Sequence, residues 1–136
     1  MTRKTLEHAY GFDDVAIVPG AVTTNPEMVS TEFHLGEHTF PVPILASSMD
    51  GVVDPKFAIA FSKLGGLAVL NLDGVWTRYE DADAVLEEIA AADLETSTKI
   101  IQRVYQEPVK EHLVGQRVAE IKAGGGMAIV GSVRCV

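Results

Sequence analysis

The feature that most constrains the fold of this chain is an alternation of short apolar runs with amphipathic stretches. Residues 42–46, 67–70 and 127–130 are mostly apolar and too short for helices, which is typical of buried strands. Longer segments with helical spacing of apolar residues separate these runs. Strands that alternate with helices along the chain predict βα units and a parallel sheet.

The predicted helices differ in how clearly their ends are marked. Residues 55–64 have the sharpest limits, because Asp54 is a favourable N-cap and Pro55 suits the first helical position. Gly65 is a typical residue to end a helix. Three residues of this segment share its apolar face: Phe57, Phe61 and Leu64. The other predicted helices are residues 79–92, 97–106 and 108–123.

The remaining sequence predicts a barrel segment with an irregular beginning. Residues 1–41 carry no βα pattern, although residues 31–42 alternate polar and apolar positions around a turn at 36–39, which predicts an antiparallel hairpin. Residues 42–136 form about three βα units. With 136 residues we expect one α/β domain, either the N-terminal portion of a TIM (β/α)8 barrel, which needs roughly 250 residues, or an open three-layer domain. A chain that ends just after its third strand indicates truncation.

Composition excludes several classes of function. The net charge is −8 and the pI is about 4.8, which argues against a general nucleic-acid or anionic-membrane surface. Neither a secretory signal peptide nor an apolar stretch long enough for a membrane span is found. The single cysteine, Cys135, excludes a disulfide framework, so the expected compartment is the cytoplasm.

Three motifs, in order and at characteristic spacing, carry a resemblance to a known family. Gly-Phe-Asp-Asp-Val-Ala-Ile-Val-Pro-Gly at 11–20 resembles the opening motif of IMP dehydrogenases and GMP reductases. Pro-Ile-Leu-Ala-Ser-Ser-Met-Asp-Gly-Val at 43–52 resembles their first barrel strand and Ser-x-Met-Asp loop, and Leu-Gly-Gly-Leu-Ala-Val-Leu-Asn at 64–71 resembles their second strand. Only short helices occupy residues 93–108, where typical members insert CBS modules, so the chain is most similar to the CBS-less IMP dehydrogenase-related branch.

This resemblance implies substrate-binding residues. It places Ser47 and Met49 against a purine nucleotide and Asn71 near the substrate or cofactor. A hydroxyl can donate to a phosphate oxygen, and a flexible thioether can lie on a purine face. The alternatives from residue type alone are that Ser47 and Ser48 form a turn, that Met49 fills a core gap, and that Asn71 is a turn residue.

The implied activity is oxidation of IMP to XMP with NAD, or reduction of GMP with NADPH as a variant. The nucleophile of the family is a cysteine late in the barrel, so Cys135 comes too early to fill this role. We therefore expect the catalytic loop and the monovalent-cation ligands beyond residue 136, an inactive isolated chain, and a homotetramer at full length. The alternative is a non-catalytic α/β module that binds a nucleotide or a sister subunit.

Several other residues have structural interpretations. Asp50 is expected to cap its own loop, with orientation of the site as the alternative, and Asp13 with Asp14 is expected to brace a turn rather than act as an acid–base pair. Residues 124–126 are three glycines, expected to form a helix-to-strand turn because the spacing is not that of a phosphate-binding loop. The four histidines lack metal-ligand spacing and are expected on the surface: His8, His34, His38 and His112.

Overall fold

The computed structural model describes residues 7–128 and 131–133, in two compact units, Met1–Ser30 and Thr31–Val136. The described part of the first unit contains two 3-10 turns, η1 (Phe12–Asp14) and η2 (Pro26–Met28). The carboxylate of Asp14 accepts a hydrogen bond from the Gly11 amide at 2.9 Å, which confirms a turn-bracing role for this acidic residue.

The second unit begins with the predicted hairpin. Strands β1 (Phe33–Leu35) and β2 (His38–Phe40) pair antiparallel, with Leu35 opposite His38 across a two-residue turn. Gly36 occupies the first turn position with a φ of 59°, a backbone conformation that glycine adopts without steric cost.

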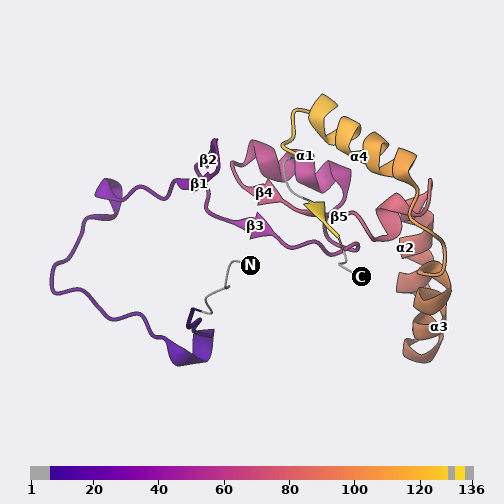
Figure 1. The fold of residues 1–136 in the computed structure, drawn as a ribbon, viewed down its shortest axis with the longest axis horizontal. Coiled ribbons are helices and arrows are strands. Elements are labelled where there is room, and N and C mark those ends of the chain that lie inside the picture. Colours follow the sequence, from indigo (N-terminus) through magenta and orange to yellow (C-terminus); the bar gives the residue numbers. More distant parts are fainter. Residues whose placement is uncertain (1–6, 129–130, 134–136) are drawn as a thin grey trace, which may run out of the picture. The chain divides into compact units, whose positions relative to one another are not determined.

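Four short strands form the predicted parallel pairings (Figure 1). Strand β3 (Leu45–Ala46) pairs with β4 (Leu67–Ala68), and β5 (Leu70–Asn71) pairs with β6 (Gly131–Ser132). The amide of Val69 donates to the carbonyl of Ala46 at 3.0 Å and extends the first ladder. Because β4 and β5 are consecutive along one segment, that segment pairs with the strand before it and the strand after it, as in successive βα units.

Two strand predictions require correction. The third strand, predicted at 127–130, is described as β6, and Met127 lies before it: its amide donates to the side chain of Ser62 at 3.0 Å instead of joining a ladder. Residues 129–130 of the predicted strand lie outside the described part. Strand β3 is also less buried than predicted, since Leu45 is 47% exposed whereas Leu67 on β4 is 1% exposed. Helix α1 packs against β4, which explains why the neighbouring outer strand is open.

The helices are α1 (Pro55–Lys63), α2 (Ala82–Ala91), α3 (Leu94–Val104) and α4 (Glu111–Ala123). The N-cap and the glycine stop predicted for α1 are confirmed, since Asp54 accepts from the Phe57 amide and Gly65 has a φ of 93°. The predicted apolar face was wrong at Leu64, which follows the last helical residue and is 73% exposed.

The later helices begin at other residues than predicted. Asp93 accepts from the Thr96 amide at 2.8 Å, so α3 begins earlier than residue 97. Helix α2 begins at Ala82 rather than at residue 79, because Asp81 caps it. A 3-10 turn, η3 (Val75–Thr77), lies a few residues before this helix. Helix α4 begins after Lys110, whose amide donates to the carbonyl of Thr77 at 2.8 Å.

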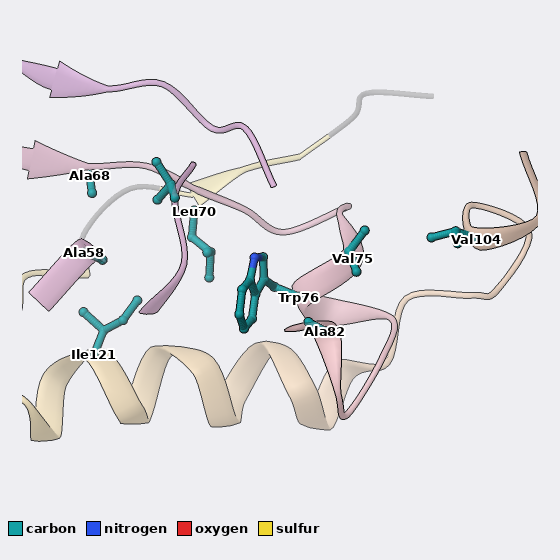
Figure 2. Close-up of a cluster of buried hydrophobic side chains, with 9 residues drawn as sticks. Ala58, Ala68, Leu70, Val75, Trp76, Ala82, Val104 and Ile121 are labelled. Atoms are coloured by element: carbon teal, nitrogen blue, oxygen red, sulfur yellow. The ribbon is translucent and has the colours of Figure 1, made fainter. Parts of the chain in front are cut away.

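Turn η3 lies at the centre of the apolar core. Figure 2 shows Trp76 between the strand that carries Leu70 and helix α4, which contributes Ile121. The buried Arg117 on α4 donates to the carbonyls of Trp76 at 3.1 Å and Glu80 at 2.8 Å, and its guanidinium lies 5.5 Å from the indole. Helix α4 therefore holds η3 by both apolar packing and charged hydrogen bonds.

At the other end of α4 the predicted glycine turn is confirmed. Gly124 caps the helix and Gly125 has a φ of 78°. A Cβ on Gly126 would lie 3.0 Å from the Cα of Ile59 on α1, so this position permits close approach of the two helices.

Candidate functional site

The loop that follows β3 presents two of the predicted site residues to solvent. Residues 47–50, called here the 47–50 loop, begin a tight turn in which the Met49 amide donates to the Ser47 carbonyl at 2.9 Å. The Val53 amide donates to the Met49 carbonyl at 2.8 Å, and Val53 is fully buried. Ser47 is exposed and Met49 is 53% exposed, so Met49 does not fill a core gap.

Asp50 is the most highly connected residue of this loop. Its Oδ2 accepts from the Val75 amide at 3.0 Å and from the Tyr105 hydroxyl at 2.6 Å, and its carbonyl accepts from the indole nitrogen of Trp76 at 3.0 Å. The prediction that Asp50 caps its own loop was wrong, because tertiary packing brings the first amide of η3 to the carboxylate. The 47–50 loop is thereby attached to η3.

Gly74 makes room for this carboxylate. A Cβ built on Gly74 would lie 1.9 Å from Oδ1 of Asp50, and this oxygen is buried with no hydrogen-bond partner among the described residues. A residue without a side chain is therefore required beside the Asp50 carboxylate.

Asn71, at the end of β5, faces a separate hollow of about 640 Å³. Its Oδ1 accepts from the Asp73 amide at 3.1 Å, which is the turn role considered for this residue. A ligand contact remains compatible with this turn, because an amide side chain carries two further donors. The hollow is lined by Asn71, Asp73, Ile101, Tyr105, Ser132 and Val133, so the structure does not bring Ser47 or Met49 into its wall.

A polar network joins this hollow to the 47–50 loop. Arg78 pairs with the carboxylate of Asp73, donates to the Glu107 carbonyl, and lies 5.3 Å from the ring centre of Tyr105. Burial, followed by the hydrogen bond to Asp50, raises the pKa of Tyr105 to about 12. The Tyr105 hydroxyl is protonated at neutral pH and donates to Asp50.

Sequence reasoning missed Tyr105, Arg78 and Ser132 as neighbours of the site. The position of Ser132 was recoverable in principle, since it ends a strand parallel to β5 and therefore lies at the same sheet edge as Asn71. Tyr105 and Arg78 gave no comparable signal, because their partners are distant in sequence.

The described residues contain no cluster of metal-ligating side chains. No group of three or more His, Cys, Asp or Glu side chains that could hold an ion occurs among them. His34 contacts Thr39 and His112 contacts Glu80, each at 2.9 Å. Cys135 lies outside the described residues. Within the described ranges no helix is long and apolar enough to cross a membrane.

A family described as "IMP dehydrogenase / GMP reductase domain" matches residues 9–87, a range that contains the 47–50 loop, Gly74 and Asn71. The chain belongs to the IMP dehydrogenase/GMP reductase family. It is similar to an uncharacterised oxidoreductase of Mycobacterium tuberculosis, with 35% identity over 127 residues that cover 90% of this chain and 34% of the relative. The IMP dehydrogenase of Korarchaeum cryptofilum is 35% identical over 65 residues, covering 48% of this chain and 14% of that enzyme.

A solved structure supports the same assignment. The crystal structure of an IMP dehydrogenase/GMP reductase-like protein from Corynebacterium glutamicum matches this fold with a TM-score of 0.77 and 28% identity. The match covers 87% of this chain and 33% of that protein, so the chain corresponds to part of a family barrel. It likewise spans about a third (34%) of the length of the mycobacterial oxidoreductases.

Proposed function

We propose that this chain supplies the first nucleotide-binding loop of an enzyme that oxidises IMP to XMP with NAD. In this proposal Ser47 donates to the phosphate, Met49 lies against the purine, and Asn71 contacts the substrate or the cofactor. Reduction of GMP with NADPH is the variant within the same family. The complete enzyme would be a cytoplasmic homotetramer.

The observation that carries the proposal is the placement of the 47–50 loop. It leaves the carboxyl end of β3, which pairs in parallel with β4, and this edge of a βα barrel is where active sites form. The loop exposes Ser47 and Met49 while Asp50 attaches it to η3, so the candidate contact groups are presented from a braced turn.

The chemistry of hydride transfer is not assigned to this part of the protein. NAD would accept the hydride when bound, and the single cysteine of the chain, Cys135, lies outside the described residues. The role proposed for these residues is to bind and orient the nucleotide.

A titration of the chain with IMP and with inosine tests the proposal. A charge-assisted bond from one hydroxyl is worth roughly 1.5 kcal/mol, so Ser47→Ala should weaken IMP binding about tenfold and leave inosine binding unchanged. The matched control is Ser48→Ala, which removes the neighbouring hydroxyl. Equal affinity of Ser47→Ala and the unmodified chain for IMP, or no binding of either ligand, would contradict the proposal.

A further inference from the structure

We infer that Tyr105 is a positioning residue, which holds the 47–50 loop in its nucleotide-binding conformation by acting through Asp50. Tyr105 is 55 residues away from Asp50 in the sequence and carries none of the contacts proposed for the nucleotide. The inference rests on the proposed function for its effect on binding, although its structural part can be tested without a ligand.

The first step is that Tyr105 is itself held in place. It follows the last residue of α3, Val104, which is buried in the core. The guanidinium of Arg78 lies over the Tyr105 ring at 5.3 Å. Arg78 is fixed in turn by its ion pair with Asp73. The Tyr105 hydroxyl is therefore delivered from a restrained ring rather than from a free side chain.

The second step is that Asp50 transmits this restraint to the loop. Oδ2 of Asp50 is shared by the Tyr105 hydroxyl at 2.6 Å and the Val75 amide at 3.0 Å. Met49 directly precedes Asp50, and its carbonyl accepts the amides of Val52 at 2.9 Å and Val53 at 2.8 Å. Rotation of the Asp50 side chain would release the turn that presents Ser47 and Met49. A loop that must be ordered on binding has a lower affinity than a loop that is already ordered.

The molecule contains a reporter for this loop. Trp76 is the single tryptophan, it is 6% exposed, and its indole N–H donates to the Asp50 carbonyl at 3.0 Å. Opening of the 47–50 loop breaks this bond and exposes the indole proton to exchange with solvent. The exchange rate of one resolved indole proton therefore measures how firmly the loop is held, with or without nucleotide.

The test compares Tyr105→Phe with Tyr79→Phe in the full chain. Each change removes one tyrosine hydroxyl near the C-terminal end of α3. Tyr79→Phe removes a hydrogen bond to the Val104 carbonyl, whereas Tyr105→Phe removes the hydrogen bond to Asp50. We expect Tyr105→Phe to raise indole exchange about tenfold and to weaken IMP binding about tenfold, as loss of one bond to a charged acceptor predicts. Tyr79→Phe serves as the control for a general loss of thermal stability. It should change the indole exchange rate and the IMP affinity by less than about twofold each.

The outcomes separate the two proposals. Unchanged indole exchange in Tyr105→Phe overturns the inference, as does faster exchange combined with unaltered IMP affinity. An unmodified chain that binds no IMP contradicts the proposed function, and the exchange comparison then still decides whether Tyr105 holds the loop. If Tyr79→Phe matches Tyr105→Phe in both measurements, the effect is general destabilisation and the inference fails.

Discussion

Replacement of Gly74 by alanine should destabilise the chain through the contact of the new methyl group with Asp50. The backbone of Gly74, with a φ of −102° and a ψ of −166°, is extended and open to any residue. Alanine there would by itself stabilise by about 0.4–1 kcal/mol, because it reduces the freedom of the unfolded chain. The opposing effect is steric, since the new Cβ would lie 1.9 Å from Oδ1 of Asp50 and 2.5 Å from its Cγ.

The magnitude follows from what the carboxylate must give up. To relieve this contact Asp50 has to move by more than about 1 Å, which breaks its bonds from the Val75 amide and the Tyr105 hydroxyl. Each bond to a charged acceptor is worth about 1.5 kcal/mol, at the lower end of the usual range because Tyr105 is partly exposed. A loss of about 3 kcal/mol, less the gain from the backbone, leaves a net destabilisation of about 2 kcal/mol.

A double-mutant cycle with Asp50→Ala isolates this mechanism. Asp50→Ala removes the atoms that Gly74→Ala would strike, so Gly74→Ala in that background should be neutral or stabilising by about 0.5 kcal/mol. The coupling between the two positions is then about 2.5 kcal/mol. Urea unfolding followed by the fluorescence of Trp76 measures each free energy. Additive effects would refute the reasoning, and so would stabilisation by Gly74→Ala alone.

Two further predictions concern ionisation and chemistry. Because the pKa of Tyr105 is raised to about 12, the contribution of this tyrosine to the free energy of unfolding should be complete below pH 10 and lost as the pH rises through 12. Asp50→Asn should bring the ultraviolet titration of Tyr105 back towards pH 10. The chain by itself should form no NADH from IMP and NAD, because its single cysteine, Cys135, comes soon after β6, whereas the nucleophile of the family lies on a loop late in the barrel. NADH formation that Cys135→Ser abolishes would show that the nucleophile has been misassigned.

The order of elements and the family were accessible from the sequence because their signals are local. Helix α1 was predicted with its cap and its glycine stop, since Asp54, Pro55 and Gly65 act within one turn of their own positions. The parallel order of β3 and β4 followed from the periodicity of the segments between them. The start of α3 at Leu94 was missed because the periodicity of apolar residues does not by itself mark where a helix begins, and here the N-cap Asp93 sets it.

The sequence by itself determined that this chain builds βα units of a known barrel family and that residues 47–50 follow the first barrel strand. Only the tertiary structure decided what holds that loop: the carboxylate of Asp50 meets Val75 and Tyr105, which follow it by 25 and 55 residues. The physical reason is that hydrophobic periodicity and capping act between residues a few positions apart, whereas a buried carboxylate takes whichever donors the packed core places beside it.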